Sequence, residues 1–115
     1  MPLLFNGCER MTLGAEMELQ ILDGNSRDLR PAASEIFERI GGEQPHIKPE
    51  IFQSIVEINT GIHSDVEGVR SDLAACLLGL RRACEPLGLD LASAGSHPFA
   101  MHRDQVVHPS DPIPD

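Results

Sequence analysis

Three glutamates and an asparagine, spaced in pairs two residues apart, are the strongest candidates for a functional site. Glu16 and Glu18 lie two residues apart in a stretch where apolar and polar residues alternate. In a β-strand, this spacing places both carboxylates on one face, with their Cα atoms roughly 6–7 Å apart. Glu57 and Asn59 repeat the spacing later in the chain. Neighbouring carboxylates repel each other unless water or a cation separates them. The pattern therefore indicates either a solvated strand face or hard oxygen ligands for Mg²⁺ or Mn²⁺.

Glu57 lies within the apolar stretch 55–58, where a charged side chain usually needs a partner. Asn59 shares its strand face and could add an amide to a site, or it could only lead into the turn at Gly61. Strict alternation places Glu50 on the opposite face from Glu57, unless the strand begins after Glu50 or contains a bulge. We therefore predict that Glu16, Glu18 and Glu57 converge on one face, and periodicity alone does not select Glu50.

His97 is a further candidate, because it follows a predicted strand and precedes Pro98. Loops at strand ends often carry site residues, although a single histidine is more often an ordinary loop residue. The remaining histidines show no spacing typical of metal ligands: His46, His63, His102 and His108. The sequence also lacks a P-loop, a dinucleotide-binding glycine motif and a serine nucleophile elbow.

Alternating strands and amphipathic helices must position these residues. Periodicity predicts strand, helix, strand, helix and strand over residues 12–22, 33–40, 51–60, 64–87 and 89–96. Residues 42–49 are expected to form a loop. The first two strands each combine an apolar face with an acidic one, whereas a sheet covered by helices on both faces would have continuous apolar strands. We therefore predict an α+β fold with helices on one face of the sheet and the other face open to a site.

The long predicted helix, residues 64–87, should form much of the core. Ser64 and Glu67 fit a capping box at its start, and Gly41 and Gly88 fit the ends of the two helices. We expect an apolar helix stripe to pack against the apolar sheet face. The expected contacts join Val69, Leu73, Leu77, Leu80 and Cys84 to Leu13, Met17, Leu19, Val56 and Ile58.

The composition describes one small acidic domain. The chain has 115 residues, of which 41% are hydrophobic, and 18 acidic residues outnumber 9 basic ones to give a formal net charge of −9. Such a charge repels nucleic acid and anionic membranes, so we expect neither as a partner. No apolar run approaches the ~18 residues of a membrane span. The first residues also lack the features of a signal peptide, so we expect a cytoplasmic protein.

The three cysteines are Cys8, Cys76 and Cys84. An odd number without a Cys-x-x-Cys pair argues against a disulfide framework and against a thiolate zinc site. Cys76 and Cys84 fall within the apolar helix stripe, so we expect both to be buried and reduced.

Three segments together resemble the glutamate–cysteine ligase type 2 family of ATP-dependent carboxylate–amine ligases. Residues 12–20 carry a Gly-x-Glu-x-Glu motif, residues 48–61 resemble the second block of the family, and residues 93–100 contain a Ser-His-Pro-Phe-Ala run similar to the third. The order and intervals of the segments also fit, over residues 11–105. Met17 and His102 depart from the residues that are common in the family.

The resemblance implies a partial glutamine-synthetase-like catalytic core, with a mainly antiparallel sheet and helices on one face. It implies ATP and Mg²⁺ (or Mn²⁺) as cofactors and small-molecule carboxylate and amine substrates. The carboxylate would be activated as an acyl phosphate, which the amine then attacks. We also expect a homo-oligomer.

By position, the resemblance assigns Glu16, Glu18 and Glu57 to the metal, Glu16 and Asn59 to the nucleotide, and Glu50 and His97 to catalysis. Family members are several-fold longer. Residues 1–115 would thus be a single partial domain, the N-terminal part of a longer catalytic domain, with residues 101–115 as an irregular tail and no activity alone. Two alternatives stay open: a non-catalytic acidic α+β interaction module, and a non-catalytic metal-binding module.

Overall fold

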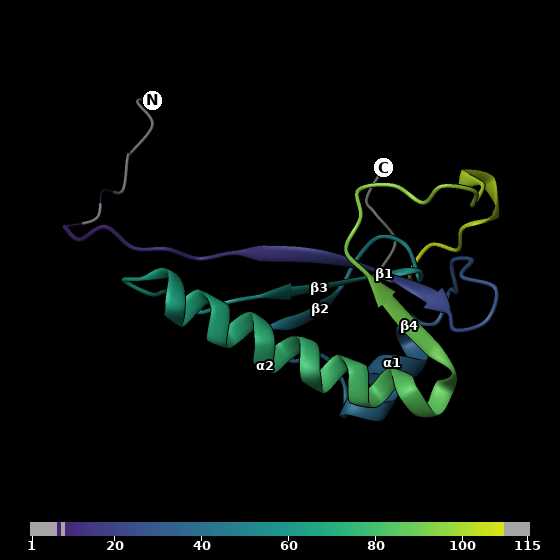
Figure 1. Cartoon of the computed structure of the whole chain (residues 1–115), viewed down its shortest axis with the longest axis horizontal. Helices are drawn as coiled ribbons and strands as arrows, with labels where there is room; N and C mark the ends of the chain where they lie inside the picture. The colour runs from purple at the N-terminus through teal and green to yellow at the C-terminus, as the bar shows by residue number, and fades with distance from the viewer. Residues whose placement is uncertain (1–6, 8, 110–115) are drawn as a thin grey trace.

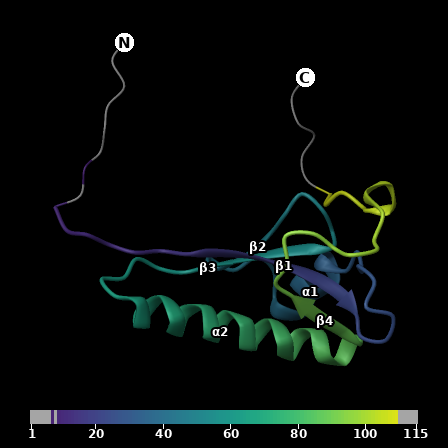
Figure 2. The same ribbon diagram turned by 45° about the horizontal axis from the view of Figure 1, so that its top comes forward.

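A computed structural model describes residue 7 and residues 9–109 of the chain. Within these residues, four strands form one antiparallel sheet with the strand order β2-β3-β1-β4. The two α-helices lie on the same side of this sheet (Figures 1 and 2). The strands are β1 Glu16–Asp23, β2 Ile47–Pro49, β3 Ile55–Asn59 and β4 Leu89–Ala92. The predicted α+β class, with helices on one face only, is confirmed.

Helix α1 spans Ala33–Ile40, as predicted, and Gly41 ends it in a left-handed conformation with φ 91°. Helix α2 spans Val66–Cys84 and continues into a 3₁₀ turn, Glu85–Leu87, which ends at Gly88 with φ 69°. A positive φ costs a glycine little because it has no Cβ. Both predicted helix ends are therefore confirmed.

The predicted capping box at the start of α2 is wrong by one residue. Asp65 is the N-cap, and its carboxylate accepts a hydrogen bond from the backbone N–H of Gly68 at 2.8 Å. An aspartate at this position satisfies one of the free N–H groups of the first helical turn. Glu67 instead forms an exposed ion pair with Arg70, at 2.8 Å.

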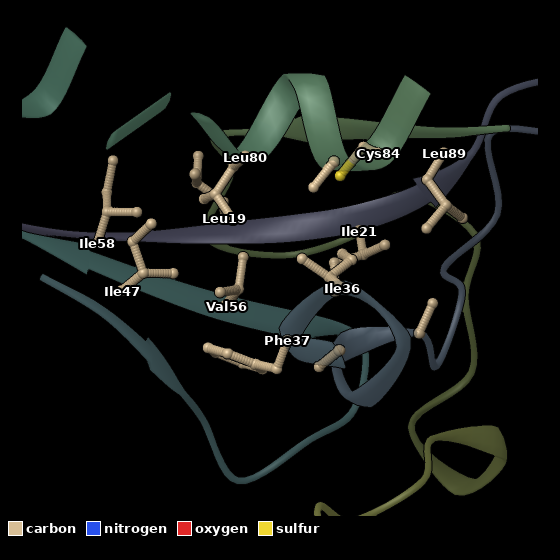
Figure 3. Close-up of a cluster of buried hydrophobic side chains, with 13 residues drawn as sticks. Leu19, Ile21, Ile36, Phe37, Ile47, Val56, Ile58, Leu80, Cys84 and Leu89 are labelled. Atoms are coloured by element: carbon tan, nitrogen blue, oxygen red, sulfur yellow. The ribbon is translucent and has the colours of Figure 1, made fainter. Parts of the chain in front are cut away.

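The core fills the space between the sheet and the helices (Figure 3). Strands and helices contribute equally to this core. The strand residues are Leu19, Ile21, Ile47, Val56, Ile58 and Leu89, and the helix residues are Ala33, Ile36, Phe37, Leu80, Ala83 and Cys84. Leu73 and Leu77 are only partly buried against this cluster. Leu13 is 43% exposed, and Val69 is half-buried outside the cluster. The predicted core is thus confirmed for Leu19, Val56, Ile58, Leu80 and Cys84. It is wrong for Leu13 and Val69, which lie outside the buried cluster.

Three strand boundaries differ from those predicted. The first strand begins at Glu16 rather than residue 12, and Leu13 makes only an isolated bridge with His63. The second begins at Ile55, because residues 51–54 form a turn before it. The third, β4, ends at Ala92. Strand β2 was not predicted, since its three residues lie in the expected loop 42–49.

The segment after β4 lies against the turn that precedes β3. It contains a 3₁₀ turn, His102–Asp104. The backbone N–H of Gln53 donates to the carbonyl of Val106 at 2.7 Å, and that of His108 donates to Ile51 at 2.6 Å. The ring of Phe52 meets His102 edge to face, with centroids 5.6 Å apart.

Two cysteines can be described, and both are free thiols. Cys84 is buried, as expected, and burial raises its pKa to about 11. Cys76 is only half-buried, which still raises the pKa of its thiol. Cys8 lies outside the described residues. None of the helices in the described part of the chain has the length and apolar character needed to cross a membrane.

Candidate functional site

The face of the sheet that points away from the helices carries the predicted carboxylates. In the antiparallel pairing of β1 with β3, Glu18 lies opposite Glu57 and Glu16 lies opposite Asn59. Residues directly opposite each other in such a pair project from the same face, with Cβ atoms roughly 4.5–5.5 Å apart. The residues between them are buried or partly buried against the helices. The predicted convergence of Glu16, Glu18 and Glu57 on the open face is therefore confirmed.

Strand β2 extends this row of side chains. Lys48 lies opposite Glu57 on the other side of β3, so Glu18, Glu57 and Lys48 run across three neighbouring strands. We call the five side chains that share this surface the acidic face: Glu16, Glu18, Lys48, Glu57 and Asn59. A shallow depression of about 430 Å³ lies over it and is lined by Gly14, Ala15, Glu16, Lys48, Glu57, Asn59 and Thr60.

Glu57 is the electrostatic centre of the acidic face. Partial burial is the largest cause that raises the pKa of its carboxyl, and the neighbouring charges of Glu16, Glu50 and Glu18 raise it further. Lys48 acts in the opposite direction. Like charges on one face disfavour the ionised form of each. This surface therefore has an excess of negative charge that a cation would neutralise.

The structure decides between the alternatives that the sequence left open for Glu50, because β3 begins after it. The turn at residues 51–54 separates Glu50 from β3, so alternation cannot be counted from Glu50 to Glu57. Glu50 directly follows β2, and its charge raises the pKa of Glu57. Glu50 thus lies near the acidic face, as the family resemblance implied, and its catalytic role stays a prediction.

His97 lies elsewhere. Its Nδ1 accepts hydrogen bonds from the backbone N–H groups of Phe99 at 3.3 Å and Ala100 at 3.1 Å. Its Nε2 lies 2.7 Å from the carbonyl oxygen of Arg27. Because Nδ1 is an acceptor, Nε2 carries the proton and donates it to that carbonyl. Arg27 follows the C-terminal end of β1, whereas Glu16 begins that strand. The structure does not bring His97 beside the acidic face, and its catalytic role stays a prediction.

The acidic face offers the donor atoms that suit Mg²⁺ or Mn²⁺, namely carboxylate and amide oxygens. Over residues 9–109, no group of three or more His, Cys, Asp or Glu side chains is arranged to hold a metal ion. Mg²⁺ is commonly held by only one or two protein carboxylates together with substrate phosphates. The opposed pair Glu18 and Glu57 fits such a shared ion better than a cage built from protein ligands alone.

Lys48 and Thr60 line the depression, and neither was among the site residues predicted from the sequence. The hydroxyl of Thr60 accepts a hydrogen bond from the backbone N–H of Ala15 at 3.0 Å and forms part of the depression. Lys48 was placed in a loop. The sequence feature that could have identified Lys48 is a short alternation, in which Ile47 and Pro49 face the helices while Lys48 faces the carboxylates.

The fold and this surface define a small α+β domain whose open sheet face is built from carboxylates. A model of the protein family described as Glutamate-cysteine ligase family 2 (GCS2) matches residues 12–112. The chain belongs to this family, which confirms the resemblance seen in its three motif segments.

Curated relatives carry corresponding names. The chain is 40% identical over 110 residues to "Putative glutamate--cysteine ligase 2" of Bdellovibrio bacteriovorus, covering 96% of the chain and 29% of that protein. It is 45% identical over 107 residues to "Putative glutamate--cysteine ligase 2-2" of Rhodococcus jostii, covering 90% of the chain and 29% of the relative. The chain therefore spans under a third of the length of these relatives.

Proposed function

We propose that this chain supplies the cation-binding face of an ATP-dependent carboxylate–amine ligase of the glutamate–cysteine ligase type. The observation that carries the proposal is the row of Glu18, Glu57 and Lys48 across three strands. In this row, the pKa of Glu57 is raised by burial and by its acidic neighbours. The membership in the GCS2 family and the names of the relatives support the same reaction class.

The proposed reaction joins two anionic groups, since a carboxylate substrate must approach the terminal phosphate of ATP to form an acyl phosphate. Bound Mg²⁺ or Mn²⁺ would supply the charge neutralisation that this approach requires. The protein's part is to hold oxygen ligands in fixed positions on a rigid sheet, which needs little reorganisation during the reaction. An amine then attacks the activated carboxyl group and releases phosphate.

The residues of the acidic face take related roles in this proposal. Glu16, Glu18 and Glu57 supply carboxylates to the cation, with the opposed pair Glu18 and Glu57 as its main ligands. Glu16 with Asn59 also orients the nucleotide end of the site. Lys48 offers a positive charge for a phosphate oxygen. Glu50 adds negative charge beside Glu57 and is the proposed catalytic carboxylate. His97 is the second proposed catalytic residue, and its two ring nitrogens are hydrogen-bonded to backbone groups.

We further propose that residues 1–115 alone bind the cation but do not catalyse ligation. A triphosphate needs several cationic partners, and Lys48 is the basic residue among those that line the described depression. Three arginines in the described part of the chain pair with carboxylates instead: Arg27 with Asp90, Arg30 with Asp23 and Arg70 with Glu67. For the whole protein we also propose a glutamine-synthetase-like core, a homo-oligomer and a cytoplasmic location.

The first test measures Mn²⁺ binding by the purified chain, using electron paramagnetic resonance of the free ion. Glu18→Gln keeps the size of the side chain and removes its charge, so it should weaken Mn²⁺ binding at least about tenfold. Glu35→Gln is a matched control, because Glu35 is exposed on α1, which covers the opposite face of the sheet. Equal affinities of the two variants would contradict the proposal.

The second test addresses ligation. Residues 12–112 would replace the matched segment of the Rhodococcus jostii relative, and ADP release would be followed with glutamate and cysteine as substrates. We expect the chimera to need Mg²⁺ and to lose most of its turnover on Glu18→Gln. An active chimera that tolerates this change would show that Glu18 does not hold the cation. Cation binding without turnover in any chimera would favour a non-catalytic metal-binding module.

A further inference from the structure

A histidine–aspartate pair lies beside the acidic face, where β3 leads into α2 (left side of Figure 1). Nε2 of His63 lies 2.6 Å from Oδ2 of Asp72, which is on the second turn of α2. The same oxygen accepts a hydrogen bond from the backbone N–H of Gly61 at 2.9 Å. These two contacts hold residues 60–63 against the helix. The side chains of His63 and Asp72 are only 27% and 35% exposed. We call His63, Asp72 and Gly61 the latch.

The other side of the His63 ring rests on the first turn of α2. A Cβ atom at Gly68 would lie only 2.4 Å from Nδ1 of His63 and 2.7 Å from Cγ. No real side chain tolerates such distances, so only glycine permits the ring to sit there. Two successive turns of α2 therefore determine where the ring of His63 lies.

The latch connects to the wall of the depression through residues 60–63. The backbone of His63 exchanges two hydrogen bonds with Leu13, at 2.7 and 2.9 Å. Thr60 donates its N–H to the carbonyl of Ala15 at 3.0 Å and accepts from the N–H of Ala15 through its hydroxyl. Ala15, Thr60 and the adjoining Glu16 all line the depression. A shift of the latch would thus move the wall beside Glu16.

We propose that His63 and Asp72 are positioning residues, which hold residues 13–15 and 60–63 in place so that Glu16 keeps its register with Asn59 on the acidic face. This inference rests on the proposed function. Neither residue touches the proposed cation. Their effect passes through the backbone hydrogen bonds of Leu13, Ala15 and Thr60. The roles that the family resemblance assigns to the acidic face do not include this positioning role, because His63 and Asp72 lie in a loop and a helix outside the sheet.

Two glycines of α2 provide a matched test. Gly68→Ala would push a methyl group into the ring of His63, whereas Gly79→Ala adds the same group where nothing lies within 4 Å. Alanine favours the helix at both positions, so the variants differ in the latch. We expect the backbone amides of Leu13, Thr60 and His63 to exchange with solvent at least about tenfold faster in Gly68→Ala, while Ile21 and Val56 stay unchanged. Mn²⁺ binding should weaken about tenfold in Gly68→Ala and stay unchanged in Gly79→Ala.

Each outcome decides between the alternatives. Faster exchange at these amides with unchanged Mn²⁺ affinity would overturn the latch proposal and leave the proposed function intact. Equal exchange in both variants, or a uniform rise over the whole sheet, would also overturn the latch proposal. Absence of Mn²⁺ binding by the unaltered chain would overturn the proposed function, and with it the positioning role. If Gly68→Ala does not fold, Asp72→Asn with Glu67→Gln as its control takes its place, with the same expected changes.

Discussion

The two ends of β1 both carry carboxylates, and the protein treats them in opposite ways. At the C-terminal end, Oδ1 of Asp23 accepts the backbone N–H groups of Asn25 at 2.8 Å and Ser26 at 2.9 Å. Its Oδ2 accepts from the guanidinium of Arg30 at 2.9 Å. These hydrogen bonds, with those of the turn as the largest cause, lower the pKa of Asp23 to about 2.

At the other end, the carboxylate pair Glu18 and Glu57 faces further acidic residues, and the pKa of Glu57 is raised. A carboxylate is therefore stabilised as an anion at the C-terminal end of β1, whereas the anion of Glu57, which pairs with the N-terminal half of β1 from β3, is destabilised. Two backbone N–H groups and Arg30 donate hydrogen bonds that stabilise the charge of Asp23, so its role is to close a turn. The acidic face has Lys48 as the opposing charge that acts on Glu57. We infer that its remaining charge is met by a ligand.

A core substitution should give the largest effect on stability and act on both ends of β1. Leu80 is fully buried and reaches toward Leu19 of β1 (Figure 3). Leu80→Ala should lower the free energy of unfolding by about 2–5 kcal/mol. Urea denaturation would measure this, with Leu78→Ala as control, because Leu78 is 48% exposed on the same helix. Equal losses in the two variants would mean that the packing of α2 on the sheet is not as described.

A substitution on the acidic face should separate binding from stability. Glu57→Gln removes the central charge, so Mn²⁺ affinity should fall at least about tenfold. The stability of the cation-free chain should stay the same or rise, because repulsion with Glu16 and Glu50 disappears. Mn²⁺ titration and thermal melting of the same samples would measure both. A variant that loses stability and keeps its Mn²⁺ affinity would reverse the proposed difference between the two ends.

The opposite pattern is expected at the other end of the strand. Asp23→Asn removes the ion pair with Arg30 and weakens the acceptor for two backbone N–H groups. The melting temperature should fall by a few degrees, an effect smaller than that of Leu80→Ala. Mn²⁺ affinity should not change. A weakened affinity would imply that the turn at Asp23 also shapes the acidic face.

Much of this comparison could be predicted from the sequence, because alternation within one strand is a local property. Glu16 and Glu18 share a face whatever the rest of the chain does, and the apolar residues of α1 with Gly41 define that helix equally well. Counting failed across the turn at residues 51–54, so periodicity could not select Glu50. Strand β2 was missed because three residues give too little periodicity.

Pairing between strands could not be predicted. Glu18 faces Glu57 because β1 and β3 adopt one register out of several that alternation permits. The latch depends on a contact between a loop residue, His63, and a helix residue, Asp72, that no periodic pattern relates. His97 follows a family motif, and its hydrogen bonds to backbone groups emerge only when two distant turns meet. These contacts are properties of the tertiary structure.

The response to acid gives the smallest effect and the finest test of the comparison. Asp23 has a pKa of about 2 in the folded chain against an ordinary value of 3.8. The stability that the ionised carboxylate of Asp23 contributes is therefore fully present above pH 3.8 and is lost as the pH falls toward 2. For Glu57 the sign is reversed, because its pKa is raised above the ordinary 4.5. Acidification from neutral pH through that raised pKa lets the folded chain bind a proton, which adds stability.

Urea unfolding across this pH range should show a small rise in the free energy of unfolding that Glu57→Gln removes, followed by a fall that Asp23→Asn reduces. Asp72, whose pKa is lowered chiefly by the hydrogen bond with His63, adds to the same fall, so some of it should persist in Asp23→Asn. A fall that begins near neutral pH and is unaffected by either variant would show that the two ends of β1 do not differ as proposed.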